Sequence, residues 1–184
     1  MKSMKSLVLI AVLAQLLIGC SSRPVFKDPK EPNHSLVLMH IDMTDAPTYA
    51  HWARATQFTP TQRFYYRFGS VPDDKLGTIL HNQEVEMGKY KFTAFGGSAG
   101  NTNYTFGFPP TGGLAKMQIK KPGIYYVGSF KYSEVKTGFF EKGKFNIEKQ
   151  DKPTEKEVLT RFLKHVEKEG KWRRMIEKRL RELK

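Results

Sequence analysis

The chain has 184 residues, a formal charge of +13 and a single cysteine. This length suits one domain with a substantial core, and one cysteine excludes internal disulfides, so packing alone must stabilise the fold. The basic excess points to an acidic partner such as nucleic acid, an anionic membrane surface or another acidic polymer; a basic surface that is merely solvated is the plain alternative.

A hydrophobic leader occupies the N-terminus. Lys2 and Lys5 precede an apolar run over residues 7–18. The run is shorter than the roughly 20 residues of a spanning helix and fits the apolar region of a secretory signal. It ends in Leu17-Ile18-Gly19-Cys20, followed by Ser21 and Ser22. This segment resembles a bacterial lipoprotein signal with its lipobox.

The resemblance implies that residues 1–19 are removed as a signal peptide and that Cys20 is lipidated. Its thiol would carry diacylglycerol through a thioether, and its new amine would carry a further acyl chain such as palmitate. Two or three acyl chains hold a protein on a bilayer far better than one, so the mature chain would stay tethered. A buried free cysteine beside the leader is the alternative.

The same resemblance implies a place in the bacterial cell envelope. Under the enteric sorting rule, a residue other than Asp after the lipidated cysteine implies export to the outer membrane, and Ser21 stands there. A position on the surface of a Gram-positive membrane stays open. Because an exported, anchored protein seldom meets nucleic acid, no nucleic-acid partner is expected.

Residues 20–33 are predicted to be the lipidated cysteine and a tether. The segment is polar and carries Pro24, Pro29 and Pro32, which favour an extended, semi-rigid backbone. It would lift the folded domain, residues 34–150, off the membrane.

The domain over residues 34–150 is predicted to be mainly β. An apolar run at 36–41 predicts a buried first strand, and residues 44–60 are expected to be irregular between prolines. Further strands are predicted roughly every 8–14 residues, over residues 62–68, 77–80, 90–95, 104–108, 114–119, 125–132 and 143–147. No helix long enough for a crossover separates them, which favours an antiparallel, Greek-key-like β-sandwich.

Two turns in this domain look alike. In each, a glycine precedes a tyrosine by two residues at the start of a predicted strand, giving Gly88 with Tyr90 and Gly123 with Tyr125. The pattern resembles the tyrosine corner of Greek-key sandwiches, in which the hydroxyl bonds back to nearby backbone. Tyr90 and Tyr125 are therefore predicted to be structural residues.

Residues 151–184 are predicted to form a charged, amphipathic helical tail. Thr154 and Glu157 fit a capping box, and apolar residues recur on one helical face before and after Gly170, which indicates two helices or one kinked helix. The tail either packs its apolar stripe on the sandwich or binds an anionic membrane or a partner groove. For the second role, Trp172 beside Arg173 and Arg174 is the candidate contact.

No catalytic motif in the sequence has the flanking elements that its chemistry requires. Gly96 to Gly100 match the G-x-S-x-G pattern of serine hydrolases, but no helix is predicted after Ser98 and the downstream His165 lies in the tail. We interpret the segment as a glycine-rich hairpin loop. The histidine spacing matches no metal motif, and no nucleotide-binding glycine loop occurs. We expect no enzyme activity, no metal and no cofactor.

Three functions remain open. The first is a non-catalytic, lipid-anchored envelope lipoprotein that binds or scaffolds another protein. The alternative is a binding module for an anionic envelope component, such as lipid A, phospholipid or cell-wall polymer. A hydrolase with a dispersed site is the third. The domain resembles small β-sandwich lipoproteins of uncharacterised function, which implies a fold and no activity.

Overall fold

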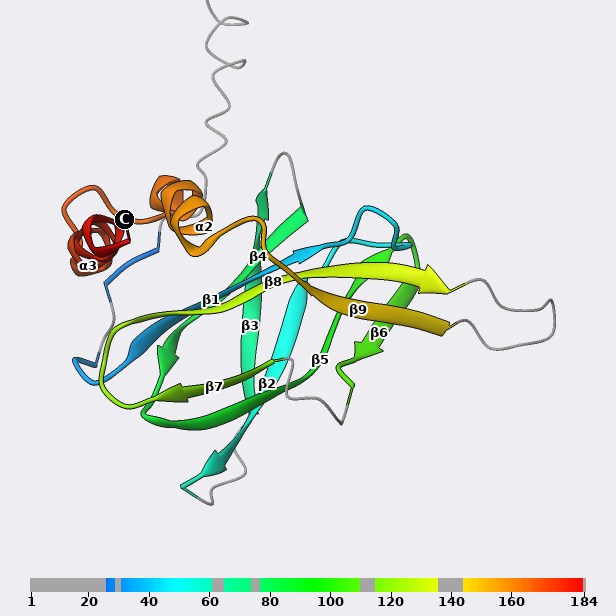
Figure 1. Cartoon of the computed structure of the whole chain (residues 1–184), viewed down its shortest axis with the longest axis horizontal. Coiled ribbons are helices and arrows are strands. Elements are labelled where there is room, and N and C mark those ends of the chain that lie inside the picture. Colours follow the sequence, from blue (N-terminus) through cyan, green and yellow to red (C-terminus); the bar gives the residue numbers. More distant parts are fainter. Residues whose placement is uncertain are drawn as a thin grey trace, which may run out of the picture.

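The computed structural model describes residues 26–28, 31–60, 65–73, 77–109, 115–135 and 144–183. The predicted signal peptide and Cys20 lie outside these residues. Within them, no helix combines the length and the apolar character needed to cross a membrane. The chain is mainly β, with a short helical region at its C-terminal end (Figure 1).

The strands form one sheet in the order β6-β5-β2-β3-β4-β1-β8-β9, with β7 paired to β5. Their bounds are β1 (Ser35–Asp42), β2 (Trp52–Thr59), β3 (Tyr65–Asp73), β4 (Gly77–Val85), β5 (Gly88–Ala99), β6 (Thr102–Gly107), β7 (Lys116–Ile119), β8 (Ile124–Val135) and β9 (Lys144–Gln150). The helical region consists of α2 (Glu155–Phe162), the 3-10 turn η1 (Leu163–His165) and α3 (Lys171–Glu182).

Strand β3 is the corner at which the sheet curls. Its residues 65–68 pair with β2, and its residues 69–73 pair with β4. We call β2, β5, β6, β7 and residues 65–68 the β2 half of the sheet. The β1 half consists of residues 69–73, β4, β1, β8 and β9. The strand predicted over residues 62–68 continues through Gly69 and Ser70 to Asp73.

The sheet is mixed, so the prediction of antiparallel pairing throughout is wrong. Strand β1 pairs with β4 in the antiparallel sense but with β8 in the parallel sense. After β1, the chain forms strands β2 to β7. Strand β8 then lies beside β1 and runs in the same direction. Mainly β character with a C-terminal helical region is confirmed.

Two apolar cores lie on opposite faces of the β1 half. The larger one fills the space between the two halves, and Val37, Met39 and Ile41 of β1 enter it. The smaller one lies under the helices and takes Leu36 and Leu38. Because β1 is covered on both faces, its sequence is a continuous apolar run, as expected of a fully buried strand.

Residues 52–59, predicted to be irregular, form strand β2 instead. Ala53, Ala55 and Gln57 point inward and are buried, while the alternate residues are intermediate or exposed. Period-2 burial of this kind is the mark of a half-buried strand. It is weak in the sequence here, because the inward residues are two alanines and a glutamine rather than large apolar residues.

Part of the predicted tether belongs to the folded domain. Phe26 forms a parallel bridge with Val166, its amide donates to the carbonyl oxygen of His165 over 2.7 Å, and its ring stacks on Phe162. Asp28 accepts a hydrogen bond from the amide of Trp172. The described residues 26–28 therefore join the helical layer.

Candidate functional site

The apolar stripe of the helical tail is buried on the β1 half. Thr154 and Glu157 form the predicted capping box at the start of α2. The stripe enters the smaller core with residues from both helices, namely Val158, Leu159, Phe162, Val166, Trp172 and Ile176. A helix whose apolar face is already covered cannot place that face in a partner groove or a membrane.

Trp172, Arg173 and Arg174, the tail residues predicted to contact a membrane or a partner, occupy different environments. Trp172 is 1% exposed, because it lies four residues before Ile176 on the buried face of α3. The idea that its ring contacts a membrane is therefore wrong for this fold. Arg174 is exposed, and its Nη1 donates to the carbonyl oxygen of Glu169 over 2.6 Å.

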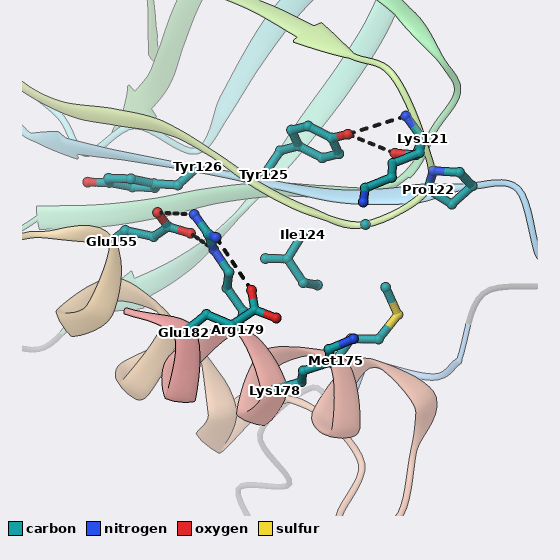
Figure 2. Close-up of a pocket in the computed structure, with 11 residues that line it drawn as sticks. Lys121, Pro122, Ile124, Tyr125, Tyr126, Glu155, Met175, Lys178, Arg179 and Glu182 are labelled. Atoms are coloured by element: carbon teal, nitrogen blue, oxygen red, sulfur yellow. Dashed lines mark hydrogen bonds and ion pairs between the residues drawn. The ribbon is translucent and has the colours of Figure 1, made fainter. Parts of the chain in front are cut away.

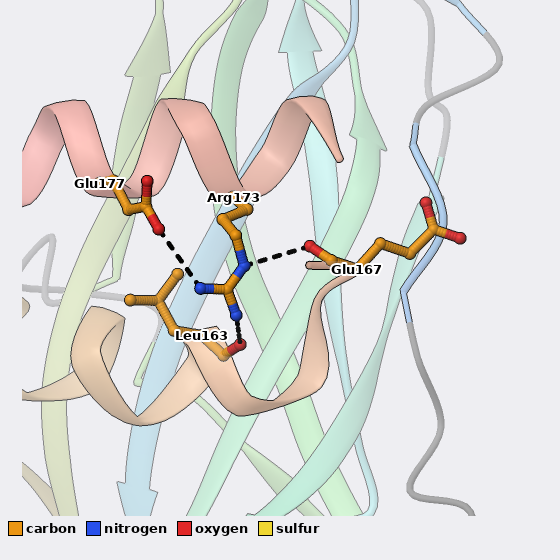
Figure 3. A network of polar contacts seen from close by, with 4 residues as sticks. All are labelled: Leu163, Glu167, Arg173 and Glu177. Atoms are coloured by element: carbon orange, nitrogen blue, oxygen red, sulfur yellow. Dashed lines mark hydrogen bonds and ion pairs between the residues drawn. The ribbon is translucent and has the colours of Figure 1, made fainter. Parts of the chain in front are cut away.

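Arg173 connects α3 to the turn that precedes it (Figure 3). Its Nε donates to the carbonyl oxygen of Glu167 over 3.2 Å, and its Nη2 donates to that of Leu163 over 3.1 Å. Its Nη1 donates to the Glu177 carboxylate over 3.3 Å. Carbonyls after a helix lack intrahelical partners, so Arg173 is a structural residue here.

Both tyrosines of the predicted corners bond back to the backbone four residues upstream. The Tyr90 hydroxyl donates to the carbonyl oxygen of Glu86, and the Tyr125 hydroxyl donates to that of Lys121, each over 2.8 Å. Tyr90 is fully buried, and burial is the largest cause that raises its pKa. Each hydroxyl is occupied in fixing a turn, as expected of a structural residue.

Ser98 lies in a β-hairpin and not on a turn between a strand and a helix. Ser98 of β5 is the cross-strand partner of Asn103 of β6, and Gly100 (φ 57°) makes the tight turn between the two strands. A side chain on Gly97 would collide with the carbonyl oxygen of Tyr49, so close backbone packing explains the glycine run. The Ser98 hydroxyl donates to Asn103 over 2.7 Å, whereas Nδ1 of His51 accepts from the Ser98 backbone amide.

His81 lies in an aromatic cluster where the N-terminal segment meets the helices. Its ring centroid is 4.2 Å from that of Phe26 and 5.5 Å from that of Phe162. Burial, with a smaller contribution from His165, lowers the pKa of His81 to about 4. No group of three His, Cys, Asp or Glu side chains suited to a metal ion occurs among the described residues.

A cleft of about 530 Å³ separates the Tyr125 corner from the helices (Figure 2). Arg179 of α3 reaches across it and holds Glu155 of α2 through two bonds of 2.7 and 3.0 Å. Arg179 also lies 3.6 Å from Glu182. Ile124 and Met175 line the cleft between these charges and the corner.

The charges in this cleft largely satisfy one another. The hydrogen bond that Arg179 donates to Glu155 is the largest cause that raises the pKa of Arg179, so the guanidinium is held by carboxylates already present. Lys121 and Lys178 add two cations to the lining, but an incoming anion would also meet Glu155 and Glu182. The cleft is therefore poorly suited to a strongly anionic ligand.

The outer face of the β2 half carries a different arrangement, which we call the basic face. It consists of the outward-pointing residues of β2, β3, β5 and β7, namely Arg54, Thr56, Phe58, Tyr65, Arg67, Lys89, Lys91, Lys116 and Gln118. Within their bounds, β2, β5, β6 and β7 contain no Asp or Glu, and neither do residues 65–70 of β3. Asp73, at the end of β3, and Asp74 are the next acids after residue 70, and Glu84 and Glu86 precede β5.

Two pairs of like charges stand directly opposite each other on this face. Arg54 of β2 is the cross-strand partner of Arg67 of β3, and Lys91 of β5 is the partner of Lys116 of β7. The Arg54 guanidinium also lies 5.4 Å from the ring centroid of Tyr65. Like charges directly opposite destabilise a sheet, so folding alone does not favour the Arg54–Arg67 pair.

The basic face is not apparent in the sequence, because residues 52–59 of β2 were predicted to be irregular and β3 was predicted to end at residue 68. The signal was still present as a long stretch without acids: residues 87–133 contain no Asp or Glu. Comparison with protein-family models, curated proteins and solved structures finds no match.

Proposed function

We propose that this chain is a lipid-anchored, non-catalytic binding protein of the bacterial envelope that binds an anionic component through its basic face. One observation carries the proposal: the outer face of the β2 half holds two opposed pairs of cations and lacks acids over the described strands. A bound anion would relieve the repulsion between Arg54 and Arg67.

Three further points support this choice over the other candidates. The tail is the less suitable site for a protein partner, because its apolar stripe is already buried. The cleft beside α3 contains carboxylates that would repel an anion. Ser98, the only residue considered as a nucleophile, donates its hydroxyl hydrogen to Asn103 and not to a base.

The envelope location remains tied to Cys20. The proposal includes a thioether-linked lipid on Cys20, cleavage before it, and an outer-membrane position as the first expectation. A Cys20→Ala chain expressed in a bacterium should then take up no labelled palmitate and should leave the membrane fraction. Palmitate labelling that persists in this variant would contradict the anchor.

The two-layer, Greek-key arrangement of the sheet is likewise a proposal, in which the β1 half and the β2 half are the two layers.

The anion-binding proposal is tested with dextran sulfate as a simple polyanion. The mature chain carrying Cys20→Ala should bind it with an affinity that falls as salt is added, because exposed charges are screened. The double variant Arg54→Gln, Arg67→Gln should bind about tenfold more weakly, which corresponds to about 1.4 kcal/mol. The matched control, Lys168→Gln with Lys178→Gln, removes the same charge from the exposed helical tail and should bind like wild type.

Two results would contradict this proposal. One is equal weakening by the face variant and the tail variant, which would show that only net charge matters. The other is binding that does not respond to salt, which would indicate an apolar or protein-specific contact.

A further inference from the structure

Resting on the proposed function, we infer that the ligand of the basic face is an extended, carboxylate-bearing glycan polymer of the cell wall. The face is inferred to lie on the side of the domain that points away from the anchoring membrane. Three features of the face lead to this partner: its cross-strand rows of cations, its exposed aromatic rings and its position relative to residue 26.

The cations stand in cross-strand rows on the outer surface of the sheet. Lys116, Lys91, Thr56 and Tyr65 are successive cross-strand neighbours on β7, β5, β2 and β3. Adjacent strands lie about 4.8 Å apart, so this row extends about 14 Å. The Arg54–Arg67 pair stands two residues further along the same strands, about 7 Å away. A surface of this kind suits a chain that repeats its charges over a similar distance.

The two arginines, together with the exposed aromatic rings of the face, favour a ligand whose carboxylates are carried along a sugar chain. Arg54 and Arg67 present planar guanidinium groups, which bind carboxylates through two parallel hydrogen bonds. Tyr65 beside them is 66% exposed and Phe58 is 48% exposed. Their ring faces offer apolar surface to the C–H faces of sugar rings, and tyrosine and arginine are both enriched where proteins bind partners.

The position at which the N-terminal segment joins the fold favours a wall polymer, rather than the lipids of the anchoring membrane, as the ligand of the basic face. Phe26 packs on Phe162, in the helical layer that covers the outer face of the β1 half. The basic face is the outer face of the other half, across the larger core. In Figure 1, α2 and α3 lie away from the ribbon of β2 and β5. With about 10 Å between packed layers, it lies about 20 Å from the helix axes on the side opposite Phe26.

The anchor keeps this orientation. Cys20 lies six positions before Phe26, and six steps along a fully extended chain span at most about 20 Å. The helical layer is therefore held near the membrane that receives the lipid. The basic face is directed toward the material above that membrane, which in a bacterial envelope includes the carboxylate-bearing wall.

The test is sedimentation with protein-free peptidoglycan sacculi, using the mature chain with Cys20→Ala so that no acyl chain contributes. Dextran sulfate, phosphatidylglycerol vesicles and single-stranded poly(dT) are run in parallel. We expect sacculi to be bound more tightly than vesicles or poly(dT). Arg54→Gln with Arg67→Gln should weaken sacculus binding about tenfold, and Lys168→Gln with Lys178→Gln should not change it.

Two further variants separate binding from folding and identify the sugar contact. Arg67→Glu places a carboxylate opposite Arg54, so it should raise the melting temperature while it lowers sacculus binding. A variant that simply misfolded would lower both. Tyr65→Ala should weaken binding to sacculi about threefold or more. It should leave binding to inorganic polyphosphate, added as a polyanion without sugar rings, nearly unchanged.

The outcomes distinguish this inference from the proposed function. Binding of dextran sulfate through the basic face, together with no binding of sacculi, would overturn the inference of a wall glycan and leave anion binding intact. A preference for vesicles or for poly(dT) would overturn it in the same way. If no polyanion binds through this face, both the inference and the proposed function fail.

Discussion

Asp28 caps helix α3 from the other end of the chain: its Oδ1 accepts a hydrogen bond of 3.2 Å from the backbone amide of Trp172. The residue at the helix's own cap position is Gly170, which has no side chain to accept that bond. The N-terminal segment thus completes the helical layer, and any pull on an anchor before residue 26 would act on the helices.

We predict that Asp28→Ala destabilises the fold by about 1 kcal/mol, the usual effect of removing a helix-capping side chain. Urea unfolding followed by circular dichroism measures this change. Asp151→Ala, which removes an exposed acid next to α2, should change the free energy of unfolding by much less. Equal effects of the two variants would show that Asp28 does not cap α3.

The stability of the fold should decrease in acid because of His81. Its pKa is lowered to about 4 in the fold, against about 6.5 in an unfolded chain. The folded state thus resists protonation, so stability is complete above about pH 6.5 and falls as the pH drops toward 4. The full effect is about 3 kcal/mol.

The measurement is the free energy of unfolding between pH 7 and pH 4 for wild type and His81→Gln. We expect the wild type to lose more stability over this interval than the variant, which lacks the titrating ring. Carboxylates contribute to both curves and cancel in the difference. Identical pH profiles would refute the role given to His81.

The two tyrosine corners should differ in their contribution to stability. Tyr90→Phe leaves the carbonyl of Glu86 without its bond at a buried ring and should cost about 1 kcal/mol. Tyr125→Phe removes the same bond at a more exposed turn, where water replaces it, and should cost less. Urea unfolding of both variants checks the order, and a larger loss for Tyr125→Phe would reverse the assignment.

The helical layer should depend strongly on Trp172. Trp172→Ala removes a fully buried indole from the smaller core and should destabilise the fold by about 3–5 kcal/mol. Trp172→Phe should cost clearly less, because its ring fills part of the space and Nε1 has no hydrogen-bond partner among the described residues. A Trp172→Ala protein as stable as wild type would place this ring at the surface after all.

The helices and strands with strong local signals could be predicted from the sequence. The capping box at Thr154 and Glu157 defines the start of α2, and the apolar run in β1 corresponds to a strand buried on both faces. Local signals did not reveal β2, because its inward residues are small. They also could not show the parallel pairing of β1 with β8, which depends on how the chain returns after about 80 residues.

The candidate site was harder to predict for a related reason. Arg54 and Arg67 are 13 positions apart, and Lys91 and Lys116 are 25 apart, so neither pair is visible as a charge cluster in the chain. Only the register of β2 with β3, and of β5 with β7, makes them neighbours. By contrast, Trp172 and Arg173 looked like surface residues because they are adjacent to Arg174, whereas the phase of α3 buries the indole.

Mapping where a polyanion binds is the most direct test of the account. In a ¹H–¹⁵N correlation spectrum of the mature Cys20→Ala chain, dextran sulfate should shift the amides around Arg54, Arg67, Lys91 and Lys116. The amides of residues 155–182 should hardly move. Shifts confined to the helices, or spread evenly over all exposed cations, would contradict the claim that this face is the binding site.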